Sequence, residues 1–442
     1  SLPVDVVLFG ATGFTGRLVA EVLLARAQAG AGFRWALAGR SAERLAAVRQ
    51  AIGAPASVPL LTADATDPAA LAALVRQTRV VITTVGPYTR HGTALATACA
   101  EAGTDYVDLC GEPLWMAQMV RQLQAPAAAS GARIVFSCGF DSVPFDLGVL
   151  FLQTEAMRRF GQPLQRVQGR VQRLRDGLSG GTAASMLATL AAVDGDPAAA
   201  RLLADPFALT PGFRGPVQPD GAVAHQDAPA GPWSGPFVMA VINTKNVHRS
   251  NALRGHPWGR DFAYDERLVT GRGLAGRVAA ELLAGGTRLQ NLALGWQPSR
   301  ALIGRLALPQ PGQGPSRRQR EAGSYDLLFT GQTVDGRTLA AKVHGDRDPG
   351  YGSTSRMLTE AALCLLQDRR ARPRPAACGR RAPPWAWHCC AGCRTTPACT
   401  LRWWIERWPN PCHGWRPTRS PGLLPLPGTT SRRSTACCAS MA

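Results

Sequence analysis

The stretch Val4-Asp-Val-Val-Leu-Phe9-Gly10-Ala-Thr-Gly13-Phe-Thr-Gly16 decides the fold of this chain. It joins a short apolar run directly to a series of regularly spaced glycines. Glycines are needed where a buried strand turns sharply into a helix, and where a pyrophosphate must approach the amides at the positively polarised helix N-terminus. The alternative is that they serve the turn alone. The residues expected to contact a dinucleotide are Gly10, Thr12, Gly13, Phe14, Thr15 and Gly16.

The first 137 residues continue as short apolar runs that alternate with amphipathic segments. The expected strands are Val4–Phe9, Trp35–Ala38, Val58–Thr62, Val80–Val85, Tyr106–Leu109 and Ile134–Ser137. The expected helices include Arg17–Ala29 and Ala42–Ile52. A parallel sheet covered by helices requires this alternation. The fold class is therefore α/β, with a doubly wound Rossmann domain that binds NAD(P) over residues 1–138.

Segments after the second and third strands indicate which dinucleotide binds. Sites for NAD usually place a carboxylate after the second strand to bind the ribose hydroxyls, but this chain has Arg40 and Ser41 there. A guanidinium and a hydroxyl suit a 2′-phosphate, so the sequence predicts NADP(H). The alternative for Arg40 is a solvated residue at a helix start. Asp64 is the candidate for the adenine, and Asp67 is expected to cap a helix before Pro68.

The segment Val85-Gly86-Pro87-Tyr88 follows the fourth strand, on the side of the sheet where the nicotinamide is expected. Val85, Gly86 and Pro87 are expected to contact the cofactor, and Gly86 would allow close backbone approach. Tyr88 has two interpretations. It orients substrate or donates a proton, or it packs where two domains meet.

The segment Cys138-Gly-Phe-Asp141-Ser142-Val-Pro144 starts the second domain. Asp141 could bind substrate or relay a proton, and Ser142 could form a hydrogen bond with a carbonyl. The alternative is that Asp141 caps the next helix, with Pro144 in its first turn. Cys138 has no histidine near it in the sequence, which favours a buried small residue over a nucleophile.

Residues 139–350 are expected to form a mixed α+β domain that shapes the substrate site. Its expected strands are Arg166–Leu174, Phe237–Asn243, Tyr325–Thr330 and Leu339–His344, and its expected helices are Phe145–Phe160 and Ala183–Val193. Asp335-Gly336 favours a tight hairpin turn, because both residues tolerate positive φ. Residues 202–236 and 306–323 are rich in Gly and Pro and are expected to be loops. A final helix, Ser353–Leu366, occupies most of residues 351–367, which are expected to return toward the Rossmann domain.

The end of the chain differs in composition from the rest. Residues 369–442 hold 13 arginines and one acid, so they carry +12 of the formal charge of +19. The first 368 residues carry the remaining +7, and their Lys and Arg residues show no helical periodicity. Nucleic acid is therefore not an expected partner. In the neighbouring reading frame, the codons over Pro384–Cys389 would encode residues that suit a packed helix. We interpret residues 368–442 as a frameshifted, unstructured tail. The alternative is a zinc site formed by Cys390, Cys393, Cys399, Cys412 and His413.

No targeting or membrane-spanning segment is evident in the sequence. The apolar run at the N-terminus lacks a preceding basic region. Apolar stretches of about 18 residues, which a spanning helix needs, do not occur. We expect a cytoplasmic protein with reduced cysteines at Cys99, Cys110, Cys138 and Cys364.

Several short motifs occur together and in order. They are GATGFTG (Gly10–Gly16), AGRS (Ala38–Ser41), VVITTVGPY (Val80–Tyr88), YVDLCGE (Tyr106–Glu112), SCGFDSVPFDLG (Ser137–Gly148), SGGTAAS (Ser179–Ser185) and DPGYGSTSRML (Asp348–Leu358). With this set, residues 3–367 resemble the saccharopine dehydrogenase-like oxidoreductases, and within them are most similar to bacterial trans-acting enoyl reductases.

The resemblance implies an NADP-dependent reductase of a lipid-type or acyl-type substrate. It also implies a second domain that often makes a homodimer contact, and peripheral association with lipid or membrane, as in eukaryotic relatives. Family members end with a Gly-Gly-Val segment and a helix, which this chain has only in the neighbouring frame. The resemblance and the cofactor motifs together predict NADPH-dependent reduction of an enoyl C=C bond.

The sequence is also compatible with other functions. A saccharopine-type amino-acid dehydrogenase would need convergent Arg or Lys side chains for carboxylates. A lipid-associated protein could bind nucleotide without turnover. Gly177-Leu-Ser179-Gly-Gly181 fits the pattern of a hydrolase nucleophile, but that turn belongs in the main parallel sheet, which here is N-terminal. A short-chain dehydrogenase is excluded, because no tyrosine has a lysine four positions later.

Overall fold

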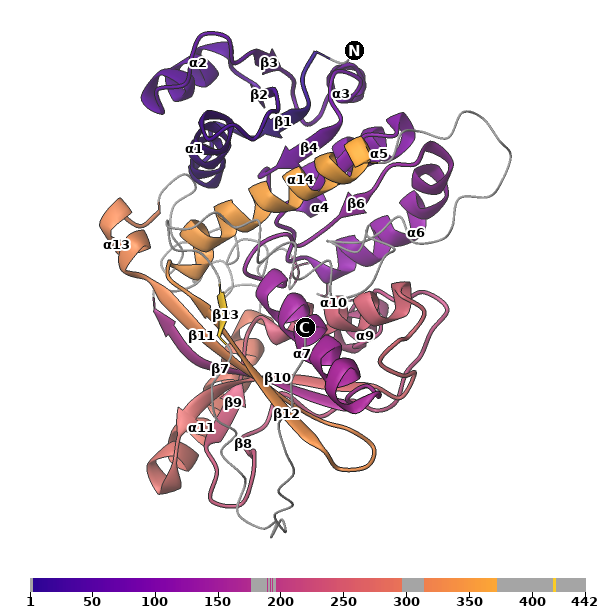
Figure 1. Ribbon diagram of the computed structural model, residues 1–442, viewed down its shortest axis with the longest axis vertical. Helices are drawn as coiled ribbons and strands as arrows, with labels where there is room; N and C mark the ends of the chain where they lie inside the picture. Colours follow the sequence, from indigo (N-terminus) through magenta and orange to yellow (C-terminus); the bar gives the residue numbers. More distant parts are fainter. Residues whose placement is uncertain are drawn as a thin grey trace, which may run out of the picture.

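The computed structural model describes residues 3–175, 196–295, 314–371 and 416–418, together with the helical positions 189, 191 and 193. Among these residues the strands form two sheets. In Figure 1 the first sheet lies in the upper part, in indigo and purple, and the second crosses the lower part in magenta to orange.

The first sheet is parallel and has the strand order β3-β2-β1-β4-β5-β6. Its strands are β1 (Val6–Phe9), β2 (Trp35–Gly39), β3 (Leu60–Thr62), β4 (Val80–Thr83), β5 (Asp105–Val107) and β6 (Ile134–Val135). The predicted Rossmann-type sheet is therefore confirmed. The strand order reverses between β1 and β4, and ligands of such sheets bind outside the carboxyl ends of the strands at that point.

Helices cover both faces of this sheet. They are α1 (Phe14–Gln28), α2 (Ala42–Ala51), α3 (Pro68–Val75), α4 (Tyr88–His91), α5 (Thr93–Ala102), α6 (Pro113–Ser130) and, from the end of the described chain, α14 (Thr354–Ala371). Val6 and Leu8 of β1 share a core with α1, α2 and α14, whereas Val7 and Phe9 share one with α3, α5 and α6. Burial on both faces explains why β1 is a continuous apolar run.

The second sheet is mixed, as predicted, with the order β13-β12-β11-β7-β10-β9-β8. Its strands are β7 (Arg166–Arg175), β8 (His225–Gln226), β9 (Trp233–Pro236), β10 (Ala263–Gly271), β11 (Ser324–Gln332), β12 (Thr338–Gly345) and β13 (Arg416–Thr418). β7 and β10 are parallel, and the other pairs are antiparallel. The predicted hairpin between β11 and β12 is confirmed, although of the Asp-Gly pair only Gly336 has positive φ, at +85°.

The strand predicted over Phe237–Asn243 is wrong, because α10 (Ala240–Leu253) occupies most of it. This apolar run is too short for its hydrophobic pattern to distinguish the helical period of 3.6 residues from the strand period of two. Its burial is helical: Ile242 is fully buried, whereas Val238 and Val241 are exposed. The further helical elements of this part are α7 (Val143–Phe160), α9 (Pro197–Ala204), α11 (Gly273–Gly295), α13 (Arg317–Ala322) and η1 (Pro349–Ser353).

The expected loops contain regular structure. β8 and β9 lie within residues 202–236, and α13 lies within residues 306–323. Residues 306–313 and most of the helix expected over Ala183–Val193 lie outside the described residues. β10 was missed because Asp265-Glu266-Arg267 gives it a charged centre, although these side chains are buried.

The chain returns to the first sheet through α14, which Figure 1 shows in orange across the Rossmann part. Leu358, Ala362 and Leu366 of α14 are buried in the core that also contains Val6 and Leu8. The unstructured tail predicted for residues 368–442 lies outside the described residues, except for the end of α14 and for β13, which pairs with the edge of β12.

Candidate functional site

The glycine turn after β1 leaves no room for a side chain at two of its glycines. Gly10 has φ +89°, and a Cβ there would lie 2.6 Å from Val85 Cγ2. A Cβ on Gly16 would lie 2.2 Å from the carbonyl oxygen of Gly10. Gly13, by contrast, is exposed and has ordinary backbone angles of φ −75° and ψ 164°. Gly10 and Gly16 are therefore needed for the turn itself, whereas Gly13 faces outward.

The N-terminus of α1 is free to bind an anion. Gly13 is the N-cap residue, and among the described residues no side chain caps the helix. Because the first amides of a helix have no intrahelical acceptor, those of Phe14, Thr15 and Gly16 remain available. Their partial positive charge favours a phosphate. The exposed Gly13 lets a pyrophosphate come close, so these residues fit the predicted dinucleotide.

The ring of Phe14 connects the glycine turn with the second half of the chain. It lies edge-on to Tyr351 of η1, with ring centroids 4.9 Å apart, and the guanidinium of Arg320 lies 5.5 Å from its centroid. Asp348 holds η1 by accepting hydrogen bonds from the amides of Tyr351 and Gly352. The DPGYGS segment is therefore placed beside the expected pyrophosphate site.

The adenosine end has an exposed guanidinium next to the capped start of α2. Arg40 is exposed, and the adjacent Ser41 caps α2 by accepting a hydrogen bond from the amide of Arg44. Asp64 accepts two hydrogen bonds from Thr66, which lower its pKa, and the charge of Arg40 adds to this effect. Arg40 and Asp64 thus lie within electrostatic reach of each other beside the ends of β2 and β3, where the sequence predicts the 2′-phosphate and the adenine.

Asp67 has the predicted capping role. Its carboxylate accepts hydrogen bonds from the amides of Ala69 and Ala70, and Pro68 follows it at the start of α3.

The segment after β4 reaches the opposite side of the glycine turn. Thr84 Oγ1 donates a hydrogen bond to the carbonyl of Gly10 at 3.2 Å, and the methyl groups of Val85 lie against the same glycine. Gly86 is exposed, while Val85 and Pro87 are half-buried. The backbone at Gly86 is therefore open on the side of the sheet where the nicotinamide is expected.

Tyr88 does not reach the open side of this segment. Its side chain is only 4% exposed and packs against Trp115. The hydroxyl accepts a hydrogen bond from the amide of Leu109 at 3.1 Å and donates one to the carbonyl of Thr83 at 3.3 Å. Burial raises the pKa of Tyr88 well above its usual value. This placement favours the packing interpretation over a role as proton donor.

Two buried carboxyl groups that sequence reasoning left without a role hold the neighbouring loops. Asp108 accepts hydrogen bonds from the amides of Cys110 and Ser137 and from the hydroxyl of Tyr106, all at 2.9 Å. Burial raises its pKa to about 7. Glu112, only 1% exposed, accepts bonds from the amides of Tyr88 and Thr89 at 2.8 Å. The position of Asp108 directly after a buried strand was a signal in the sequence, whereas Glu112 had none.

Replacing Glu112 with glutamine is expected to loosen the segment after β4. One of the two backbone amides would then face an NH₂ group instead of an acceptor, at a cost of about 1.5–3 kcal/mol for a bond to a charged group. We expect a lower midpoint of urea unfolding and a raised Michaelis constant for the dinucleotide. Glu43→Gln on the exposed side of α2 is the control, and equal effects of the two changes would contradict this role.

Ser142, not Asp141, is the N-cap residue of α7, so the capping interpretation of Asp141 is wrong. Pro144 does lie in the first turn of α7. Asp141 is half-buried. Ser142 is 5% exposed and has φ 156° and ψ −42°, a conformation that side chains other than glycine rarely adopt. Its hydroxyl contacts Asn243 and Asn246 of α10, which come from distant sequence.

The parallel sheet brings most of the predicted cofactor residues together. The glycine turn, Arg40-Ser41, Asp64 and Val85–Pro87 follow β1, β2, β3 and β4, which are adjacent strands. Asp141 and Ser142 follow β6, two strands away from β4 at the same edge. The G-x-S-x-G segment at Gly177–Gly181 lies outside the described residues.

The described part of the chain contains neither a candidate metal centre nor a membrane-spanning helix. Within it, no group of three or more His, Cys, Asp or Glu side chains could hold a metal ion. No helix among the described residues is long and apolar enough to cross a membrane.

Comparison with known proteins gives a consistent set of relatives. Residues 6–135 match the family model described as the saccharopine dehydrogenase NADP binding domain. A protein named as a candidate trans-acting enoyl reductase of Mycobacterium tuberculosis (strain ATCC 25618 / H37Rv) is 44% identical over 378 residues, covering 83% of this chain and 89% of that protein. A trans-acting enoyl reductase of Mycobacterium ulcerans (strain Agy99) is 40% identical over 381 residues, with the same coverage of 83% and 89%.

Among solved structures, an apo saccharopine dehydrogenase (L-Glu forming) from Saccharomyces cerevisiae aligns with a TM-score of 0.46 and 14% identity, over 84% of this chain and 92% of that chain. An amine dehydrogenase from Mycobacterium smegmatis aligns with a TM-score of 0.39 and 14% identity, over 84% and 93%.

Proposed function

The chain belongs to the trans-acting enoyl reductases of the saccharopine dehydrogenase-like oxidoreductases, and from this premise we propose that it reduces the C=C bond of an acyl substrate with NADPH. It is an NADP-dependent oxidoreductase. One observation carries the site assignment: the uncapped N-terminus of α1 and the exposed guanidinium of Arg40 lie at the carboxyl ends of adjacent strands. This pairing suits a pyrophosphate and a 2′-phosphate.

In the proposed reaction, the N-terminus of α1 and Arg40 would hold NADPH, which would supply the hydride for the carbon of the double bond farther from the acyl carbonyl. The chain must offer a hydrogen-bond donor to the carbonyl oxygen, on which negative charge develops. It must also let a proton reach the carbon beside the carbonyl. We assign that proton to water, because the hydroxyl of Tyr88 is buried and engaged. Positioning of the acyl group by the second domain then sets specificity.

Arg40→Asp is expected to reverse the cofactor preference. Loss of a bidentate guanidinium–phosphate contact and introduction of a negative charge should weaken NADPH binding by about 100-fold, while NADH binding should change little. The measurement is a fluorescence titration of the full chain with each dinucleotide. Arg76→Asp is the matched control, since Arg76 is an exposed arginine at the far end of α3.

Unchanged preference for NADPH in Arg40→Asp, or equal losses in Arg40→Asp and Arg76→Asp, would refute the assignment of Arg40. Turnover is tested separately, by following NADPH oxidation with crotonyl-coenzyme A as an enoyl thioester probe. Binding of NADPH without oxidation of it by any enoyl thioester would favour the lipid-associated binding protein instead.

A further inference from the structure

A chain of hydrogen bonds runs from Ser142 into the core of the second domain. Asn246 Nδ2 donates to Ser142 Oγ at 2.6 Å, and Ser142 Oγ donates to Asn243 Oδ1 at 3.3 Å. Asn243 Nδ2 donates to Glu266 Oε2 at 2.9 Å, and the Tyr264 hydroxyl donates to Glu266 Oε1 at 2.8 Å. Asn243, Tyr264 and Glu266 are at most 1% exposed. The network therefore links a core carboxyl group to the hydroxyl at the start of α7.

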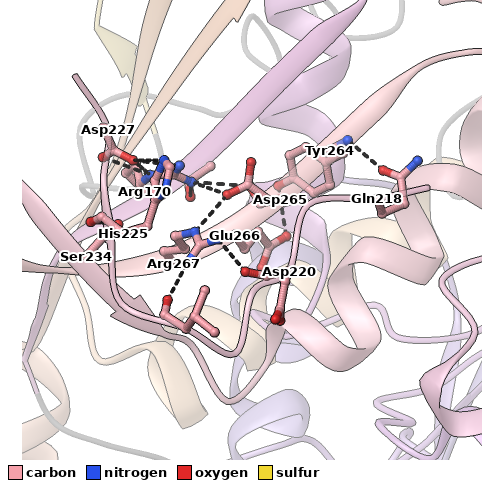
Figure 2. Close-up of polar contacts among 12 residues, drawn as sticks. Arg170, Gln218, Asp220, His225, Asp227, Ser234, Tyr264, Asp265, Glu266 and Arg267 are labelled. Atoms are coloured by element: carbon pink, nitrogen blue, oxygen red, sulfur yellow. Dashed lines mark hydrogen bonds and ion pairs between the residues drawn. The ribbon is translucent and has the colours of Figure 1, made fainter. Parts of the chain in front are cut away.

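Glu266 has no ion-pair partner among the residues that the structure describes. Side chains alternate along β10, so Asp265 and Arg267 lie on the opposite face from Glu266, where they form ion pairs (Figure 2). Glu266 instead faces Tyr264 on its own strand, Gly169 of β7 and Asn243 of α10. A carboxylate in such a place is costly unless it takes up a proton.

The other charged groups nearby do not offset this cost. Burial raises the pKa of Glu266 to about 8, with Asp265 acting in the same direction and Arg170 in the opposite one. Asp146, on α7, is hydrogen-bonded to Ser250. His248 of α10 contacts Gln218 rather than this network. Burial among neutral partners therefore favours the protonated form of Glu266, whose hydroxyl must find an acceptor.

The orientation of the Asn243 amide decides where that hydroxyl points. A half-turn of the amide exchanges its oxygen and nitrogen without moving the backbone. With an ionised Glu266, the amide nitrogen faces the carboxylate, and the amide oxygen takes the proton of Ser142. With a neutral Glu266, the amide oxygen accepts the carboxyl proton, and the amide nitrogen donates to Ser142. Only this second arrangement gives the carboxyl proton of Glu266 an acceptor while the Tyr264 hydroxyl still donates to Glu266 Oε1.

The two arrangements give Ser142 opposite properties. In the first, its proton is bound by Asn243, so the hydroxyl can only accept a hydrogen bond from a ligand. In the second, Asn243 and Asn246 both donate to Ser142, so its own proton is free for a ligand acceptor. An enoyl thioester needs a donor at its carbonyl oxygen as charge develops there. The neutral network thus supplies what the proposed reaction requires.

We propose that Glu266 and Asn243 are positioning residues that turn the Ser142 hydroxyl into a hydrogen-bond donor for the acyl carbonyl of the substrate. The inference rests on the proposed enoyl reductase function. It extends that function by giving Ser142 one direction of hydrogen bonding and by assigning that direction to a protonated carboxyl group in the core.

The test compares kcat/KM for crotonyl-coenzyme A across pH in the full chain and in Glu266→Gln. Glutamine keeps an NH₂ donor group beside a carbonyl acceptor at every pH, so it imitates the neutral acid permanently. In the parent protein the active form carries the proton, and kcat/KM should fall as pH rises through about 8. In Glu266→Gln that falling limb should disappear. Glu155→Gln, a carboxyl paired with Arg158 at the surface of α7, should keep it.

Ser142→Ala should lower kcat by about 100-fold, as loss of a donor to a developing oxyanion does. In a variant that already carries Ser142→Ala, adding Glu266→Gln should have no further effect on the pH profile. Glu266 acts on the substrate only through the hydroxyl of Ser142. A falling limb that persists in Glu266→Gln, or full activity of Ser142→Ala, would overturn the proposal.

Two further measurements separate this inference from the proposed function. NADPH binding should be the same in the parent and in Glu266→Gln, since Glu266 lies in the second domain. The infrared difference spectrum between them should contain the band of a neutral carboxyl group at pH 7. If the parent binds NADPH but does not reduce the probe, the proposed function fails. If the carboxyl band is absent from the difference spectrum, the role of Glu266 fails whatever the turnover.

Discussion

Gly16→Ala is expected to abolish NADPH binding and to destabilise the first domain. The added Cβ would lie 2.2 Å from the carbonyl oxygen of Gly10 and 2.9 Å from Ala11 Cα, and both are backbone atoms that no rotamer change can move. α1 must therefore shift away from β1. Overpacking of this kind costs about 1–3 kcal/mol of stability. Because the amides that bind the pyrophosphate belong to the displaced turn, affinity for NADPH should fall by at least about 100-fold.

Gly13→Ala is the matched control, because it adds the same methyl group to the same turn. At Gly13 the Cβ would lie 3.4 Å from the nearest atom, and the backbone angles suit any residue. Stability should change by less than about 0.5 kcal/mol. NADPH binding should still weaken, since the methyl group would stand where the pyrophosphate approaches. Thermal unfolding and fluorescence titration measure the two effects, and a stable Gly16→Ala that binds NADPH like the parent would refute the turn's role.

The Rossmann domain could be predicted from the sequence because its signals are local. Strand, glycine turn and helix lie within consecutive residues, and the Asp67–Pro68 step marks a helix start on its own. The adjacency of β1 and β4 follows from a topology that many sequences share. Residues 10–16, 40–41, 64 and 85–87 were therefore placed at one edge of the sheet from the sequence, and the strand order agrees.

The contacts that position the site could not be predicted, because they join distant segments. Nothing near Glu112 indicates that its carboxylate binds the amides of Tyr88 and Thr89. Tyr88 follows an exposed glycine, yet its ring turns inward onto Trp115. Ser142 and Asn243 are more than a hundred positions apart, and their contact requires α10, which the sequence pattern assigned to a strand. The charged side chains of β10 can be buried because distant residues such as Arg170 pair with them, and these pairs exist only in the folded chain.

Arg170→Met is expected to be among the most destabilising changes in the second domain. Arg170 is 3% exposed and forms ion pairs with Asp227 at 2.8 Å and with Asp265 at 3.0 Å. Figure 2 shows Arg170 between these two acids. Arg267 also pairs with Asp265, and its guanidinium reaches backbone carbonyls of the 220–223 segment. Without Arg170, Asp227 loses its arginine partner, and Asp265 keeps only its pair with Arg267. Breaking a buried ion pair by removing one partner costs about 3–5 kcal/mol, because an uncompensated charge is left in the core.

Arg173→Met tests whether burial, rather than charge alone, causes this loss. Arg173 lies on the same strand, but its pair with Asp326 is 3.9 Å long and its side chain is 52% exposed. Exposed pairs contribute about 0–1 kcal/mol, so Arg173→Met should leave the midpoint of urea unfolding almost unchanged. Trp233 and Trp258, both in the second domain, provide the fluorescence signal. Similar losses in the two variants would mean that β7 needs positive charge in general; a loss confined to Arg170→Met would mean that the ion pairs fasten the 218–236 segment to the sheet.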